Sequence, residues 1–165
     1  MRNYIDNILT YTLVAMFLLA GNLHSASAEQ SKLSVPRFVS IKFNEVNVRT
    51  GPAKDCPIEW VFIKKGEPVE VVAEYDGWRK VRDINGEGGW AHSSVLSRHR
   101  FVVITTNNIT PLLGNPADYD NVVAKVSPKL RCALKKCKKD WCLIDCNSYK
   151  GWLPKKYLWG VYPEE

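Results

Sequence analysis

The sequence predicts an all-β protein made of two small barrels in tandem. Short strands recur at near-even spacing with turn residues between them, which is typical of a small barrel or sandwich. Residues 77–90 form an expected hairpin bounded by Trp78 and Trp90, and a weaker copy of this hairpin spans residues 140–152. After the first 28 residues no window of 11 residues carries a helical stripe of apolar positions. A unit present twice indicates two copies of one small domain.

The N-terminal segment has the features of a signal peptide. A basic Arg2 precedes an apolar run at 8–20, and Ala26-Ser27-Ala28 fits a cleavage site, so residues 1–28 are the expected leader. A membrane anchor is the alternative, but the run is shorter than the ~20 residues of a spanning helix. We therefore expect an exported protein of the periplasm or cell envelope, with no stable membrane span after cleavage.

Residues 37–104 are the expected first barrel, after a polar linker at 29–36. Residues 37–43 alternate apolar and polar positions, as a half-buried strand does. Asn85-Gly86 favours a two-residue turn in the tryptophan hairpin. The segment 101–104 is expected to close this barrel.

Residues 109–165 are the expected second barrel, a degenerate repeat of the first. Residues 112–117 correspond in the repeat to residues 49–53, and residues 132–137 correspond to the expected strand at 69–74. The stretch 151–158 repeats 89–96. The boundary between the copies is short, which indicates that the two barrels pack together.

The motifs of the first copy resemble the bacterial SH3-like domain. They are Arg49-Thr50-Gly51-Pro52 after a strand, then Gly77-Trp78, then Gly89-Trp90. The second copy lacks the first motif, but its Pro154 and Tyr157 follow Gly151-Trp152 as in the last-strand motif of eukaryotic SH3 domains, where they help to form a peptide groove. The resemblance implies a five-stranded, non-catalytic barrel that binds peptides, often of the cell wall, or protein partners.

The expected binding groove in the second barrel consists of Trp141, Pro154 and Tyr157. The spacing of Pro154 and Tyr157 around one helical turn can bring both to one side, against Trp141, where Lys155 and Lys156 would attract an acidic ligand. The alternative is that Trp141 and Tyr157 seal the interface between the barrels. Trp78 and His92 occupy the matching places of the first barrel, whose groove should be poorer.

Four other tryptophans are expected to serve packing. Trp90 and Trp152 each follow a glycine in a closing strand and would fill the barrel interiors. Trp159 is a candidate for the contact between the barrels, and Trp60 for packing within the first barrel.

Four cysteines lie on the two arms of one hairpin. If Cys137 faces Cys142, then Cys132 and Cys146 are one position out of register, and a β-bulge in one arm would correct this. Cys137–Cys142 is thus the stronger disulfide prediction and Cys132–Cys146 the weaker. Zinc is the alternative, but the spacings differ from the C-x-x-C pairs of structural sites, and export favours disulfides.

A spare cysteine and two histidines do not make a convincing catalytic centre. Cys56 lies in a loop before Pro57, as a free thiol or a link between two chains. Only His92 and His99 could serve it as a base, and the two barrels leave no segment for a catalytic domain. We expect no enzyme activity, no metal site and no cofactor.

The formal net charge of +6 favours acidic polymers as partners, although a basic surface can serve solubility alone. Basic clusters and aromatic residues are also the ingredients of nucleic-acid binding, but an exported protein seldom meets nucleic acid. The sequence predicts a non-catalytic binding protein that recognises peptidoglycan or its peptide stems. The alternative partner is an envelope protein that presents an extended segment to a periplasmic adaptor.

Overall fold

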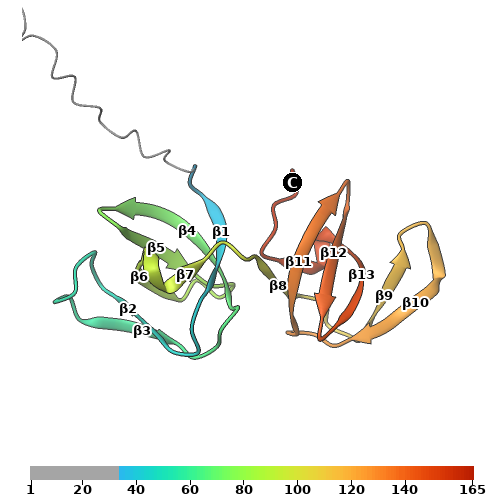
Figure 1. The fold of residues 1–165 in the computed structure, drawn as a ribbon, viewed down its shortest axis with the longest axis horizontal. Helices are drawn as coiled ribbons and strands as arrows, with labels where there is room; N and C mark the ends of the chain where they lie inside the picture. The colour runs from blue at the N-terminus through green and yellow to red at the C-terminus, as the bar shows by residue number, and fades with distance from the viewer. Residues whose placement is uncertain (1–33) are drawn as a thin grey trace, which may run out of the picture. The chain divides into compact units, whose positions relative to one another are not determined.

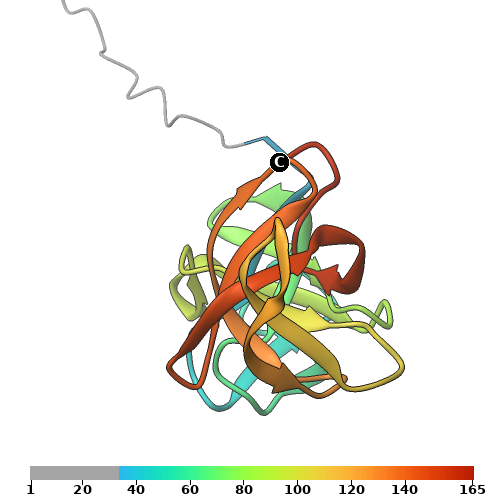
Figure 2. The ribbon, with the colours of Figure 1, turned by 90° about the vertical axis from the view of Figure 1, so that its right-hand side faces the viewer.

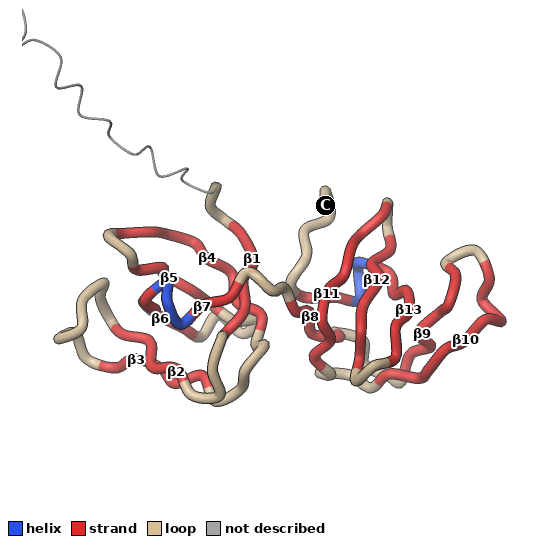
Figure 3. Tube along the Cα trace, in the orientation of Figure 1, coloured by secondary structure: helices blue, strands red, loops and turns tan. Residues whose placement is uncertain are grey.

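The computed structural model describes residues 34–165, where strands and two single 3-10 turns make up the regular structure (Figures 1 and 3). Each half of this region forms one antiparallel seven-stranded sheet, which confirms the all-β class and the tandem organisation. Seven strands are two more than the resemblance implied, and they include strands of only two residues. The expected signal peptide and most of the linker lie outside the described residues. No helix in residues 34–165 is long and apolar enough to cross a membrane.

The first sheet has the spatial order β3-β2-β6-β5-β4-β1-β7. Its strands are β1 (Arg37–Ile41), β2 (Val46–Arg49), β3 (Ile58–Phe62), β4 (Pro68–Tyr75), β5 (Trp78–Arg82), β6 (Gly88–His92) and β7 (Leu96–Ser97). The 3-10 turn η1 (Ser93–Val95) connects β6 to β7.

The second sheet repeats this order as β10-β9-β13-β12-β11-β8-β14. Its strands are β8 (Phe101–Ile104), β9 (Thr110–Asn115), β10 (Asp118–Val126), β11 (Arg131–Lys138), β12 (Trp141–Cys146), β13 (Tyr149–Pro154) and β14 (Leu158–Trp159). The turn η2 (Lys155–Tyr157) precedes β14. Figure 2 shows how strongly this sheet curls, its strands crossing one another in the view.

Strand β8 belongs to the second sheet, not to the end of the first barrel as expected. It pairs with β11 and β14, just as β1 pairs with β4 and β7. The backbone confirms the equivalence, because the amide of Ile41 donates to Glu67 O at 2.9 Å and that of Ile104 donates to Leu130 O at 3.0 Å. The second repeat therefore begins with β8, directly after the loop that follows β7.

Each sheet encloses its own apolar core. The first cluster is Val39, Ile41, Val46, Val48, Phe62, Val69, Val71, Val81 and Ala91. The second cluster is Val102, Ile104, Leu112, Val126, Cys132, Cys142, Ile144, Cys146, Leu153 and Leu158. The two disulfides thus lie in or against the second core, whereas the first cluster contains no cysteine.

Trp90 and Trp152 do not fill the barrels, so that prediction was wrong. Along a strand successive side chains point to opposite faces, and the buried positions next to them are Ala91 and Leu153. Both tryptophans are half-buried instead. The Lys136 ammonium lies 5.8 Å from the Trp152 ring centroid. Trp60 is also more open than expected, at 39% exposure.

The tryptophan hairpin closes with a longer loop than the two-residue turn expected. The amide of Asp83 donates to Glu87 O at 2.8 Å, so the loop between β5 and β6 spans residues 83–87. The Asp83 carboxylate accepts from the amides of Asn85 and Glu87 at 2.8 and 2.9 Å. Gly86 takes the left-handed φ of 87° that the turn requires. This side-chain cap favours the wider loop.

Both predicted disulfides are present, and the predicted bulge brings the second pair together. Cys137 faces Cys142 directly, and the register then shifts between Leu134 and Lys136. This shift allows Cys132 to bond with Cys146. The first barrel has the same irregularity between Val71 and Ala73. Cys56 is a free, half-buried thiol.

Aromatic and polar contacts join the two repeats. The Phe38 ring of β1 lies 5.0 Å from Trp159 and 4.7 Å from Tyr162, which confirms Trp159 as a contact between the barrels. The Tyr162 hydroxyl donates to the buried Glu70 carboxylate at 2.7 Å. Burial and this hydrogen bond raise the pKa of Tyr162 well above its usual range.

Candidate functional site

The groove predicted in the second barrel has Trp141 and Pro154 side by side. Trp141 begins β12 and Pro154 ends β13, and the antiparallel register makes them direct partners. Both side chains are half-buried, so each presents an apolar face beside the hollow that they line. Two of the three residues predicted for this groove therefore line one hollow, and its role in binding stays a prediction.

The groove has a volume of about 600 Å³ and includes residues that the sequence did not single out. Tyr119 of β10, 71% exposed, lies edge-on to Trp141 with 6.2 Å between ring centroids. Leu158 and the C-terminal segment Val161, Tyr162 and Pro163 line the hollow as well. Tyr119 stands between two aspartates in the sequence, and only the pairing of β10 with β9 brings it near the groove.

Tyr157 takes a different place from the one expected. Its half-buried side chain packs against the second core, and the Lys156 ammonium lies 5.0 Å from its ring centroid. Its backbone carbonyl accepts from Thr105 N at 2.9 Å. Tyr157 is not among the residues lining the groove, where the buried Leu158 is found instead.

The two lysines of η2 differ in how accessible their ammonium groups are to a ligand. The Lys155 ammonium donates to Pro163 O at 3.1 Å and also to Glu165 O, so the C-terminal segment already engages it. Lys156 is exposed and lines the same groove. The groove therefore joins an aromatic and proline surface to at least one cation open to solvent.

Trp78 and His92 form the matching pair in the first barrel. They are direct partners of β5 and β6, with 5.5 Å between ring centroids. His92 Nδ1 lies 2.7 Å from Ser94 Oγ and accepts from Ser94 N at 3.3 Å, capping η1. His92 thus has a local structural role that Pro154 does not have.

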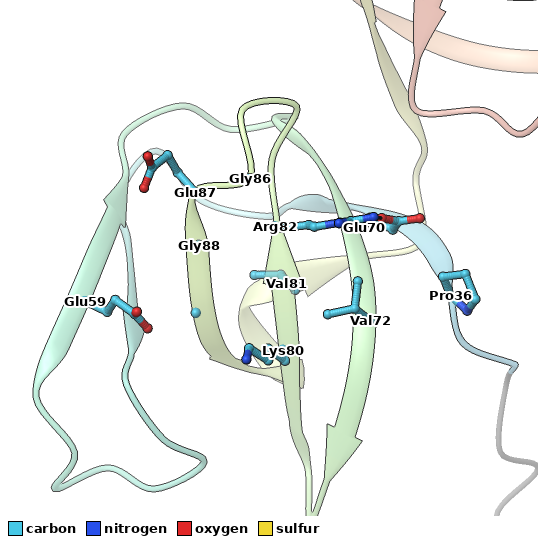
Figure 4. Close-up of a pocket in the computed structure, with 11 residues that line it drawn as sticks. Pro36, Glu59, Glu70, Val72, Lys80, Val81, Arg82, Gly86, Glu87 and Gly88 are labelled. Atoms are coloured by element: carbon cyan, nitrogen blue, oxygen red, sulfur yellow. Dashed lines mark hydrogen bonds and ion pairs between the residues drawn. The ribbon is translucent and has the colours of Figure 1, made fainter.

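A second hollow, of about 650 Å³, lies in the first barrel (Figure 4). It is lined by charged side chains of both signs, among them Glu59, Lys80 and Glu87. At its edge Arg82 pairs with Glu70 at 2.6 Å. The mixed charges make this hollow polar, in contrast to the aromatic groove of the second barrel.

Within residues 34–165, no group of three or more histidine, cysteine, aspartate or glutamate side chains is placed to hold a metal ion. The polar and aromatic lining of the groove consists of one tryptophan, two tyrosines, two prolines, two lysines and Asp140, a set typical of a binding surface. Its arrangement suits non-covalent recognition of an extended ligand.

Among curated proteins the chain is similar to YrvJ of Bacillus subtilis (strain 168), which is named provisionally as an N-acetylmuramoyl-L-alanine amidase. The two are 23% identical over 128 residues, which cover 72% of this chain and 24% of YrvJ. The chain therefore spans about a quarter of the length of this relative.

Two solved structures from Trichomonas vaginalis are similar at low identity. NlpC2 is 12% identical with a TM-score of 0.35, over 79% of this chain and 50% of that chain. NlpC1 is 14% identical with a TM-score of 0.35, over 78% of this chain and 47% of that chain. These TM-scores support no argument about the arrangement or the function of this chain.

The family comparison matches both repeats separately. The family described as "Bacterial SH3 domain" matches residues 42–98 and residues 107–160. The matched segments contain β2 to β7 of the first sheet and β9 to β14 of the second. The chain therefore belongs to the bacterial SH3 domain family, with two copies of the domain in tandem.

Proposed function

We propose that this chain is an exported, non-catalytic binding protein of the cell envelope that recognises the peptide stems of peptidoglycan. The family, and the similarity to YrvJ with its provisional name of N-acetylmuramoyl-L-alanine amidase, support a role at peptidoglycan. The observation that carries the proposal is the groove in which Trp141 partners Pro154 and contacts Tyr119. Trp78 and His92 form a weaker counterpart in the first barrel.

The shape and composition of this groove suit an extended peptide. Tryptophan and tyrosine offer large, stiff contact areas with a polar end, and they lose little conformational freedom on binding. An aromatic surface with proline accepts an extended chain along its length. The exposed ammonium of Lys156 at the groove would attract the carboxylates of a stem peptide. Salt would weaken this electrostatic attraction.

The shared length with the relative supports a binding role without catalysis. The aligned segment covers only a quarter of YrvJ, and the family model matches this chain at residues 42–98 and 107–160. His92 caps a 3-10 turn, and Cys56 lies in the loop before β3. We therefore assign neither residue a catalytic role, and the proposed function consists of binding alone.

The second candidate function is an adaptor that binds an extended segment of an envelope protein. Strand β10 favours it, because β10 is an edge of the second sheet and its residues 118–123 are exposed beside the groove. An exposed edge can pair with an added strand through backbone hydrogen bonds.

Retention on purified sacculi separates these two functions. The protein that lacks residues 1–28 should sediment with sacculi at moderate salt and be released by excess soluble stem peptide. Retention that stem peptide does not displace would contradict the proposed ligand. Failure to sediment, together with stoichiometric capture of one envelope protein, would favour the adaptor.

A further inference from the structure

A third hollow, of about 550 Å³, lies where the two repeats meet, and it has a different chemistry from the groove. The end of β1, the turn before β4, the loop after β7 and strand β11 all contribute to it. We call it the junction cleft. Its volume is in the range of ordinary ligand sites.

All the charged side chains that line the junction cleft are basic. They are Lys42, Lys65, Arg100 and Lys135, with His99 beside them. None of the ion pairs found among residues 34–165 involves Lys42 or Lys65. Arg100 pairs with Glu165, and the Lys135 ammonium lies 3.4 Å from the Asp145 carboxylate. The cleft thus concentrates positive charge from both repeats.

The bulge in β11 accounts for the composition of one wall. In a regular strand Leu134 and Lys135 would point to opposite faces, yet both line the cleft. Lys135 is the residue that the register shift leaves without a direct partner on β12, and such bulges turn a side chain toward a new direction. The equivalent bulge of the first barrel, at Val72, carries no charge.

Aromatic side chains give the cleft an apolar surface between its cations. Phe43 is 48% exposed, and the Lys42 ammonium lies 5.3 Å from its ring centroid. The Phe101 ring lies so close to Gly66 that a Cβ there would be only 3.2 Å from it. A methyl group at Gly66 would crowd this ring. The contact between Gly66 of the first repeat and Phe101 of the second thus joins the two repeats along the cleft.

The basic surface continues beyond the cleft. An adjoining hollow shares His99, Arg100, Leu134 and Lys135 with it, and adds Arg98 and Lys136. Its one acidic side chain, Glu165, is already paired with Arg100. Together the two hollows make a path of positive charge longer than one small ligand.

We propose that the junction cleft binds a linear anionic glycan, a polymer of sugar units that carry carboxylate or phosphate groups. Lysine and arginine would meet the anionic groups, and the exposed ring of Phe43 would contact the apolar face of a sugar. A concave path suits a single chain rather than the flat surface of a membrane. This site is separate from the peptide groove of the second barrel, whose lining it does not share.

The test uses polygalacturonate, a linear carboxylated glycan, and its fully methyl-esterified form as the matched neutral polymer. The mature protein should bind the first and not the second, with an affinity that falls as salt rises. The double variant Lys65→Glu, Lys135→Glu should weaken binding about tenfold or more. The control variant Lys54→Glu, Lys125→Glu changes the net charge equally at exposed positions outside the cleft, and it should bind nearly as the unmodified protein.

Several outcomes would overturn this proposal. Equal loss in the two double variants would show an effect of net charge alone. Binding to vesicles of phosphatidylglycerol and phosphatidylcholine in equal parts, without binding to polygalacturonate, would assign the surface to a membrane. If the charge-reversed protein does not fold, the variant Phe43→Ala takes its place, because this exposed residue lies outside both cores. Unchanged glycan binding in Phe43→Ala would contradict the proposed site. Trp141→Ala should leave glycan binding intact, so failure here is distinct from failure of the peptide groove.

Discussion

At the scale of single residues, the alternation along β13 decides which apolar side chain stabilises the second barrel. Leu153 is fully buried in the core, whereas Trp152, the larger residue, is half-buried under Lys136. The free energy of a core residue comes from the apolar area removed from water and from the packing around it. Size alone is therefore a poor guide to stability here.

We predict that Leu153→Ala destabilises the protein more than Trp152→Ala. The first change leaves a cavity in a closed core and should lower the free energy of unfolding by about 2–5 kcal/mol. The second removes a half-buried ring beside solvent and should cost about 1 kcal/mol. Urea unfolding followed by circular dichroism measures both, and a larger loss for Trp152→Ala would contradict the assignment of faces.

Residue patterns predicted the centre of the groove but not its full lining. Trp141 and Pro154 could be identified because each occupies a recognisable place in a repeated motif. Tyr119 could not, because it becomes a neighbour of Trp141 only through the fold of the sheet. Tyr157 was assigned to the groove by spacing, whereas the turn η2 directs it against the core.

At the scale of elements, β11 and β12 form a hairpin that is cross-linked at two positions. Two disulfides link its arms, and a bulge between them sets the register. The equivalent hairpin of the first barrel, β4 with β5, has the bulge but no cysteine. The bulge is thus compatible with the fold in the absence of cross-links.

Removing the Cys132–Cys146 bond should destabilise the protein more than removing Cys137–Cys142. The cysteines of the first bond are 14 positions apart in the sequence, and those of the second bond are only 5 positions apart. On the loop-entropy account the losses are about 3 and about 2 kcal/mol. Paired Cys→Ala variants compared by urea unfolding test this order, and a reversed order would show that packing of the sulfurs outweighs loop closure.

Charged side chains hold the C-terminal segment, residues 160–165, in place: Arg100 pairs with Glu165, and Lys155 donates to the Glu165 carbonyl. Burial alone would raise the pKa of Glu165, but the hydrogen bond from Arg100, the backbone amide of Tyr162 and nearby cations lower it below its usual range. A carboxyl group with a lowered pKa in the folded state stabilises that state above its ordinary pKa. The stabilisation is lost as the pH falls through the lowered value.

Glu165→Gln should therefore lower the melting temperature at pH 7 but have little effect in acid. The difference between the two proteins should begin to shrink below the ordinary carboxyl pKa of 4.5. Differential scanning calorimetry from pH 7 to about pH 3 covers this window. A difference that stays constant with pH would mean that the Glu165 charge does not hold the segment.

The elements themselves were largely predictable, and the exceptions have physical causes. Alternating and apolar runs identify strands, but they do not say which sheet a strand joins. Strand β8 was assigned to the first barrel for that reason, although its hydrogen bonds place it in the second. The turn at Asn85-Gly86 widened because the Asp83 carboxylate holds two amides of the loop.

At the scale of the whole molecule, duplication has given two similar barrels with different surfaces. The Trp78 and His92 pair of the first barrel is matched by Trp141 and Pro154 in the second. The first barrel has a hollow of mixed charge, and the junction between the repeats carries a basic cleft. One fold used twice thus presents hollows of different chemistry, for which we propose a peptide ligand and an anionic glycan.

The central claim is that the groove of the second barrel binds the stem peptide. It is tested most directly by titrating a soluble stem peptide into the unmodified protein, Trp141→Ala and the matched Trp78→Ala, with the melting temperature of each measured alongside. We predict that Trp141→Ala weakens binding about tenfold or more with the melting temperature little changed, while Trp78→Ala binds nearly as the unmodified protein. Equal weakening in both variants, or a loss of affinity in Trp141→Ala that only follows a large fall in its melting temperature, would contradict the claim.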